Sequence, residues 1–376
     1  MVALVVAVIV GVGVGAGSVH AGRAAPAACL TGEARSLVLI SARTGAIEQS
    51  FPGIRGANVV LADGHGGWFV GGSVSCFDGL NAVSVLHLDR TGRLDRTFRV
   101  TRGAPISVLA LSGSALYAAG GFGVEAVNAA TGARRWVTRV SGGMQPRVSG
   151  VAANSEAVYI GGAFTDVSGV PQPPLVALDA RTGKLLDWRA PTLRGGLPAT
   201  SIPRVEVDAV ALDGSRLFIG SNTISSVGGR ARPGIAALDA RTGALTAWRP
   251  GNVRGYRAVG DVETILIAHG EVFTAGHDGF GVTNAASGKV EKWMNQIEGV
   301  ASHFAAAGDI VYLGADIRNS FTAVARQARN NLAAIDLATG HFTSWAPDID
   351  TDVAVGSMAA SRDRVLVAGS FSKTLG

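Results

Sequence analysis

Hydrophobic and polar residues alternate in short runs along this chain, most clearly in residues 175–189, LVALDARTGKLLDWR. Such alternation over about four to eight residues is typical of a half-buried β-strand. Asp179 and Gly183 lie between two of these runs. An Asp side chain can accept hydrogen bonds from the N–H groups of its own turn, and Gly adopts the positive φ that closes it. The segment therefore predicts a β-hairpin.

A second hairpin is predicted directly upstream, with strands at residues 148–153 and 157–162. Both hairpins recur along the chain, the upstream one ending each time in glycine. The downstream one occurs seven times, with its turn glycine at Gly45, Gly92, Gly132, Gly183, Gly243, Gly288 and Gly340. A repeat of about 40–60 residues with four short strands per unit is typical of a β-propeller.

The two ends of the chain carry complementary halves of this repeat. Residues 37–51 form a downstream hairpin without an upstream one, and residues 353–371 form an upstream hairpin without a downstream one. Pairing them completes one blade and removes two sheet edges. We predict an all-β, seven-bladed β-propeller of four-stranded blades, closed by these two hairpins, as a single domain over residues 29–376.

The first residues of the chain have a different pattern. Residues 2–14 are apolar and are followed by small residues, which is typical of a secretory signal peptide. The run is shorter than the ~20 residues of a membrane span. We expect residues 1–28 to be removed and the protein to be secreted or associated with the cell envelope. Export would permit a disulfide between Cys29 and Cys76, the only cysteines; two free buried thiols are the alternative.

Arginines gather in segments that a propeller brings to one face, namely the connections between strands two and three and between blades. Acidic residues are sparse there apart from Asp348, Asp350 and Asp352. A basic surface attracts anionic polymers or acidic partners. With a net charge of only +5, a general preference for arginine is the alternative interpretation. The candidate ligand-binding residues are Arg194, Arg204, Arg230, Arg232, Arg254, Tyr256, Arg257 and Arg318.

Residues 157–191, AVYIGGAFTDVSGVPQPPLVALDARTGKLLDWRAP, resemble the repeat of secreted bacterial propellers built from delta-sixty-type repeats. The resemblance implies a secreted propeller but no defined ligand. The downstream hairpin is also similar to the tryptophan-docking motif of pyrroloquinoline-quinone propellers, through Ala177, Asp179, Gly183 and Trp188. Here the tryptophan comes one residue later than that motif expects.

Repeated residues are predicted to be structural. One aromatic residue ends the fourth strand of each unit, which indicates packing between blades: Trp136, Trp188, Trp248, Trp293 and Trp345, with Phe51 and Phe98 elsewhere. The turn residues Asp179, Asp239, Asp336, Asn128 and Asn284 are one per unit, too far apart to act as an acid–base pair. Residues 348–352 begin like a calcium loop but lack its glycine and its final glutamate.

Two enzymatic alternatives use the same fold. A quinone-dependent oxidoreductase would need Ca²⁺ ligands and an aspartate base near the axis. A sialidase-like hydrolase would need an arginine cluster and a tyrosine nucleophile, for which only Tyr256 lies in a loop. We predict instead a monomeric, non-catalytic scaffold without cofactor or metal. Its expected partner is an envelope glycan or protein, not nucleic acid.

Overall fold

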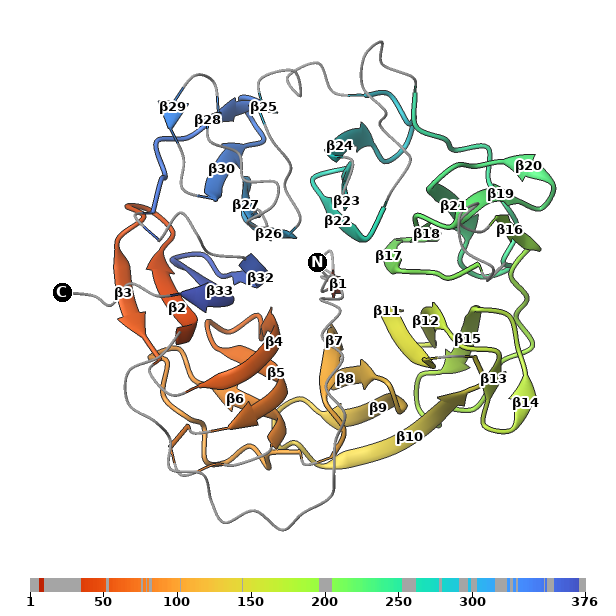
Figure 1. The fold of residues 1–376 in the computed structure, drawn as a ribbon, viewed down its shortest axis with the longest axis horizontal. Coiled ribbons are helices and arrows are strands. Elements are labelled where there is room, and N and C mark those ends of the chain that lie inside the picture. The colour runs from red at the N-terminus through yellow and green to blue at the C-terminus, as the bar shows by residue number, and fades with distance from the viewer. Residues whose placement is uncertain are drawn as a thin grey trace.

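The computed structural model describes most of the repeat region. The described residues are 7–9, 35–51, 54–75, 77–78, 80, 83–101, 103–143, 145–195, 205–251, 262–276, 279–290, 297–298, 303–314, 323–324, 327–328, 331–347, 349 and 355–371. They form antiparallel β-sheets arranged around a central axis (Figure 1). Among them there is no helix of the length and apolarity needed to cross a membrane.

Seven sheets follow one another around the axis in the described residues, consistent with the predicted seven blades (Figure 1). The first strand given for each blade is the inner one. The blades are 1 (β4 Arg55–Ala62, β5 Trp68–Ser75, β6 Val83–Leu88), 2 (β7 Ile106–Ser112, β8 Ala115–Gly120, β9 Gly123–Asn128, β10 Arg134–Ser141), 3 (β11 Arg147–Ala153, β12 Ala157–Ala163, β15 Leu175–Asp179), 4 (β17 Ala209–Asp213, β18 Arg216–Gly220, β21 Ile235–Asp239), 5 (β22 Thr264–Ala268, β23 Glu271–Gly276, β24 Gly279–Asn284), 6 (β26 His303–Ala307, β27 Ile310–Gly314, β30 Leu332–Asp336, β31 His341–Phe342) and 7 (β32 Val355–Ala360, β33 Arg364–Phe371, β2 Arg35–Ser41, β3 Ile47–Ser50).

Blade 7 is built from both ends of the repeat region. Strand β2 pairs with β33 in an antiparallel ladder that places Val38 opposite Val367. The order of the sheet is β3-β2-β33-β32. The predicted pairing of the two terminal hairpins is therefore confirmed, and it closes the ring.

The predicted four-stranded blades are shorter than expected at their outer edge. In blades 1, 3, 4 and 5 the fourth strand is reduced to one bridge, as between Leu178 and Leu185. The chain leaves the ladder early because the tryptophan that follows packs on the next blade. Trp188 illustrates this, since its indole N–H donates to a carbonyl of blade 4.

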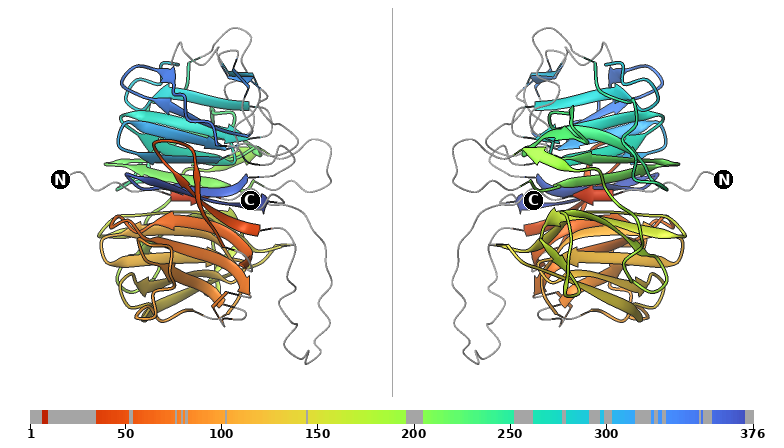
Figure 2. Two further views of the ribbon diagram at one scale, coloured as in Figure 1. Left: turned by 90° about the vertical axis from the view of Figure 1, so that its left-hand side faces the viewer. Right: turned by 90° about the vertical axis from the view of Figure 1, so that its right-hand side faces the viewer.

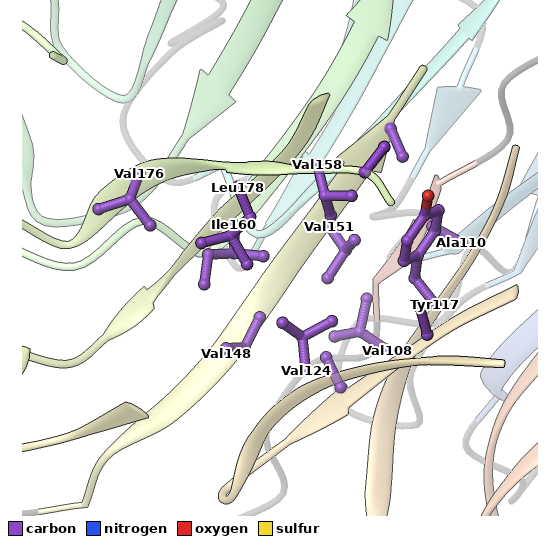
Figure 3. Packing of buried hydrophobic residues seen from close by; sticks show 14 of the residues in the cluster. Val108, Ala110, Tyr117, Val124, Val148, Val151, Val158, Ile160, Val176 and Leu178 are labelled. Carbon is purple, nitrogen blue, oxygen red and sulfur yellow. The ribbon is translucent and has the colours of Figure 1, made fainter. Parts of the chain in front are cut away.

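The hydrophobic core is divided among the interfaces between neighbouring blades, one cluster for each interface. Figure 3 shows the cluster between blades 2 and 3, where Val108, Val124 and Tyr117 face Val151 and Ile160. These side chains are almost completely buried. Because each sheet buries both faces, strands such as residues 175–178 are apolar at successive positions rather than strictly alternating.

The aromatic residues at the blade ends join neighbouring blades by hydrogen bonds. Each indole donates to a backbone carbonyl in the following blade: Trp136 to Ala180, Trp188 to Ala240, Trp248 to Asn284 and Trp345 to Ser41, at 2.8–3.2 Å. The predicted packing role is confirmed for these four. Trp293 lies outside the described residues.

The turn that receives such a tryptophan depends on its glycine. Gly183 has φ +70°, and a Cβ atom there would lie 2.5 Å from the Cε3 atom of Trp136. Asp179 accepts the N–H groups of Arg181 and Thr182 through its Oδ1 atom, as predicted for a turn former. The Asp and Gly of the repeat therefore shape the surface on which the preceding blade rests.

The two faces of the ring differ. Because strands alternate in direction, the hairpin turns lie on one face, the turn face, while the connections from strand two to three and from blade to blade lie on the other, the loop face. Figure 2 shows the ring from its side, with the two faces at the left and right of each view. Insertion hairpins lie on the loop face. The hairpin of β13 (Asp166–Val167) and β14 (Val170–Pro171) extends the sheet of blade 2 beyond β10. Two separate small sheets are formed by β16 (Leu193–Gly195) with β19 (Ile224–Val227) and β20 (Arg230–Ala231), and by β25 (Ile297–Glu298) with β28 (Ala323–Val324) and β29 (Gln327–Ala328).

One further strand, β1 (Ala7–Ile9), lies on the axis of the ring (Figure 1). It pairs with the inner edge of β7 in an antiparallel ladder, with Ala7 opposite Ala110 and Ile9 opposite Val108. It lies close to the inner strand of every blade. The axis is therefore wide enough for one extended chain.

Candidate functional site

The outer part of the loop face carries the predicted arginines on a small sheet beside blade 4. Arg194 lies on β16 and Arg230 on β20, the two outer strands of the sheet β16-β19-β20. Both are exposed. Neither forms an ion pair with a carboxylate among the described residues. The two guanidinium groups are thus open to an anionic ligand.

Arg232, next to this sheet, is buried although it carries a charge. Only 7% of its surface is exposed. Its Nη1 and Nη2 atoms donate to the carbonyls of Ala231 and Thr246, at 2.9 and 3.4 Å, while its Nε atom is buried without a partner in the described structure. Burial lowers the pKa of Arg232, and the positive charges of Arg249 and Arg230 lower it further. Three arginines therefore create a positive potential at this point of the rim, and no described carboxylate neutralises Arg232.

The remaining residues of the predicted site lie outside the described residues: Arg204, Arg254, Tyr256, Arg257 and Arg318. The same holds for Cys29 and Cys76 of the predicted disulfide and for Asp348, Asp350 and Asp352. The structure thus brings Arg230 and Arg232 close to each other, with Arg249 beside them. Arg194 is opposite Ser226 and Ala231 in the small sheet, and its side chain therefore lies on the other side from that of Arg230. The other positions remain predictions.

The loop-face end of the axis has polar residues that the sequence analysis missed. The inner strands have β-bulges there, at Asn58 in blade 1, Ser107 in blade 2 and Ser149 in blade 3. In blades 4 and 5, Asp208 and Glu263 stand at the corresponding position, each after a valine that packs on a glycine of the preceding blade. A bulge redirects a side chain out of the regular ladder and is common next to functional sites.

Two polar contacts hold the part of this region that lies in blades 3 and 4. Arg147 and Glu206 form an ion pair at 2.7 Å. Ser221 donates from Oγ to Asp208 Oδ2 at 2.7 Å. The side chain of Ser149, which is 9% exposed, has its Oγ atom buried without a partner in the described structure. The loop face is therefore basic at its rim and polar with carboxylates at its centre.

This arrangement corrects the expectation that acidic residues are sparse on the loop face. A signal for it exists in the sequence, because an apolar residue followed by a polar one begins several inner strands, as in Val148-Ser149, Val207-Asp208 and Val262-Glu263. The pattern was hidden because each pair, taken alone, continues the alternation expected of any half-buried strand.

The tyrosines of the repeat are not set up as nucleophiles. Burial raises the pKa of Tyr117 and Tyr159, and it raises the pKa of Tyr312 to about 12. The hydroxyl of Tyr159 donates to the Ala240 carbonyl at 2.7 Å, and that of Tyr312 donates to Ala42. These buried tyrosines therefore pack within and between blades.

The calcium ligands that a quinone-dependent enzyme would need are not assembled in the described part of the chain. No three His, Cys, Asp or Glu side chains come together there in a way that could hold a metal ion. Asp208 already accepts a hydrogen bond from Ser221.

A half-buried titratable cluster lies in blade 1, near the turn face. The ring of His87 is within 3.0 Å of Asp63 Oδ2 through Nε2 and within 2.9 Å of Asp95 Oδ2 through Nδ1. Burial acts to lower the pKa of His87, but the two carboxylates raise it above its ordinary value of 6.5. The imidazole also packs on Phe69 and Phe98. It is fixed on every side, which indicates a structural role.

The turn-face end of the axis contains a cavity of about 640 Å³. It is lined mainly by small and apolar residues of blades 1, 2, 6 and 7, including Leu61, Leu111, Ala305, Ala307 and Met358. Leu111 directly follows the three residues of β7 that pair with β1. The cavity therefore continues the axial channel beyond the segment that β1 occupies.

Comparison with known proteins identifies the repeat. The family described as outer membrane protein assembly factor BamB, PQQ_2, matches residues 19–249 and again residues 99–347. This supports the predicted similarity to pyrroloquinoline-quinone-like propeller repeats. No curated protein matches the chain.

Two solved structures are among those to which the chain is similar. The WD40 domain of Neurospora crassa Pan2 is 11% identical over 67% of each chain, with a TM-score of 0.36. The computationally designed Ika4 protein is 14% identical over 49% of this chain and 90% of its own, with a TM-score of 0.31.

Proposed function

The chain belongs to the family of the outer membrane protein assembly factor BamB, and from this premise we propose that it is a non-catalytic binding scaffold at the cell envelope. Its ligand is an anionic polymer, bound by the arginines at the rim of the loop face. The signal-like residues 2–14 and the resemblance to secreted delta-sixty-type propellers support export. The name of the family refers to assembly, which suits a scaffold.

The observation that carries the proposal is the grouping of Arg230, Arg232 and Arg249 without a described carboxylate beside Arg232. A buried guanidinium is ordinarily paired, because an unpaired buried charge is costly. Arg guanidinium groups bind carboxylate, sulfate and phosphate groups through two parallel N–H donors. A polymer that presents such groups repeatedly would contact the exposed arginines together and offset the potential around Arg232.

The test is binding of heparin, as an acidic glycan probe, to the wild-type protein and two double variants. Arg230→Gln with Arg249→Gln should weaken binding about tenfold, because both are exposed charges beside Arg232. Arg181→Gln with Arg241→Gln is the matched control, since it removes the same charge from exposed residues of the turn face. Binding should also weaken steeply as salt rises, as expected for exposed charges.

Two results would reject this function. One is equal loss of binding in both double variants, which would mean that heparin responds only to total charge. The other is an affinity that does not change with salt. The same assay with Arg254 and Arg257 replaced by Ala would show whether the predicted site extends into that segment.

A further inference from the structure

We propose that the axial channel is a binding site for an extended, apolar peptide segment, which pairs with the inner edge of β7. In this structure the site is taken by the chain's own strand β1. This site differs from the arginine rim in position and in ligand chemistry.

The backbone geometry shows how such a segment is held. Strand β1 runs antiparallel to β7, and three consecutive residue pairs are in register, from Ala7 with Ala110 to Ile9 with Val108. An inner strand of a propeller has one edge bonded within its blade and one edge facing the axis. That second edge presents backbone N–H and C=O groups that can add a strand. The segment at the axis is thus bound as one additional strand beside the seven inner strands of the blades.

The walls of the channel favour an uncharged occupant. The inner strands next to β1 are formed by apolar residues where they run along the axis, as in Val108–Ala110, Ala209–Leu212 and Phe304–Ala307. A charged side chain placed among them would lose its hydration without gaining a partner. The first residues of the chain fit this demand, since ALVVAVIVG at residues 3–11 contains no charge.

The channel also has room for more than the three paired residues. Toward the turn face it opens into the cavity of about 640 Å³, which Leu111 and Ala307 line. Toward the loop face it ends at the polar bulge positions, including Ser107, which directly precedes the paired residues. With β7 seven residues long, a segment of about six residues can lie along it at ~3.3 Å per residue.

Cleavage during export would free the axial channel of β1. If residues 1–28 are cleaved as proposed, β1 leaves with them, while every pairing that joins the blades and closes the ring lies within residues 35–371. The channel then offers the edge of β7 to a segment of another protein. A partner with an extended, uncharged apolar segment has this chemistry.

The experiment measures binding of a fluorescent peptide, ALVVAVIVG flanked by glutamines, by anisotropy. The chain starting at residue 29 should bind it saturably, and the unprocessed full-length chain about tenfold more weakly because β1 competes. Full-length protein with Val8→Asp, which expels β1, should bind as well as the shortened chain. The same peptide with Val8→Asp is the control probe and should bind at least tenfold more weakly.

Protein variants locate the site. Ser107→Arg at the loop-face mouth and Ala307→Arg in the cavity should each weaken binding about tenfold. Ser155→Arg, on the exposed turn between β11 and β12, adds the same charge elsewhere and should leave binding unchanged. Circular dichroism would check that each variant is folded. Hydrogen exchange should show that the peptide protects β7 rather than the outer strands β3 and β10.

The proposal is overturned if the folded shortened chain and the Val8→Asp full-length chain both fail to bind the peptide. It is also overturned if Ser107→Arg and Ser155→Arg behave alike, or if protection appears on the outer strands. Because the peptide is uncharged, its binding should not depend on salt, whereas heparin binding should. Failure of one therefore leaves the other unaffected.

Discussion

His87 is a charged residue placed inside blade 1 with a carboxylate on each side. Its pKa lies above 6.5, so its contribution to stability is complete below that pH and is lost as the pH rises through the folded-state pKa. Burial opposes ionisation of Asp63 and Asp95, but hydrogen bonds and the nearby His87 charge hold their pKa values below 3.8. Their contribution is complete above that pH and is lost as the pH falls through their folded-state pKa values. The cluster is therefore most stabilising between these two limits.

We expect the melting temperature of the wild-type protein to fall between about pH 6 and pH 8.5, and His87→Gln to reduce this fall. His65→Gln is the control, because His65 is exposed and lies in the turn that contains Asp63. Thermal unfolding followed by circular dichroism at both pH values checks the prediction. If the two variants show the same pH dependence, His87 is not the residue responsible.

The sequence predicts the roles of turn residues but not the roles of residues whose contacts form between separate strands. The turn role of Asp179 and Gly183 follows from local chemistry, because both the hydrogen bonds and the positive φ lie within five residues. The burial of Arg232 and the placement of two carboxylates beside His87 do not follow from local chemistry. They depend on which residues of separate strands meet, and that is fixed only when the blades pack.

At the scale of elements, the contact between blades 3 and 4 shows how one backbone carbonyl can join two strands. Ala240 O accepts the indole N–H of Trp188 at 2.8 Å and the hydroxyl of Tyr159 at 2.7 Å. The two rings are edge-to-face, with centroids 5.6 Å apart. The same pair of aromatic residues in blade 2, Trp136 and Tyr117, provides only the indole hydrogen bond to its acceptor.

We expect Trp188→Phe and Tyr159→Phe each to lower the free energy of unfolding by about 1 kcal/mol or less. Combined, they should cost more than the sum, because the carbonyl then loses both donors. Trp136→Phe with Tyr117→Phe is the control pair and should be additive. Urea denaturation of the six variants measures this. Additivity in both pairs would contradict the shared-acceptor interpretation.

The elements themselves were largely predictable, with two physical exceptions. Inner and middle strands followed from alternation and from turn residues. The fourth strands are shorter than predicted because residues such as Trp188 bind the next blade instead of continuing the ladder. The axial strand β1 could not be foreseen, because an apolar run at the start of a chain has the same pattern whether it is a leader or a strand.

At the scale of the whole molecule, stability depends on blade 7. The two hydrophobic clusters that flank this blade combine residues of β2 with residues of β32 and β33. Without the C-terminal hairpin, strand β2 would lose its ladder and the ring would stay open between blades 6 and 1.

A chain ending at residue 354 is therefore expected to lose cooperative unfolding and to aggregate, since it exposes apolar surface and strand edges. A circular permutant that starts at residue 355, with residues 371 and 35 joined by a linker, is the control. It keeps every blade pairing and should stay folded and monomeric. Size-exclusion chromatography and denaturation distinguish the two. A truncated chain as stable as the permutant would show that closure is dispensable.

The position of the seam in blade 7 also sets the order of events during biogenesis. Synthesis from the amino end delivers residues 35–50 first and residues 355–371 last. The early hairpin must therefore wait for its partner strand until synthesis ends. Closure of the ring therefore requires the complete chain. A chain that is incomplete at its C-terminus cannot pair β2 with β33 and stays accessible to proteases.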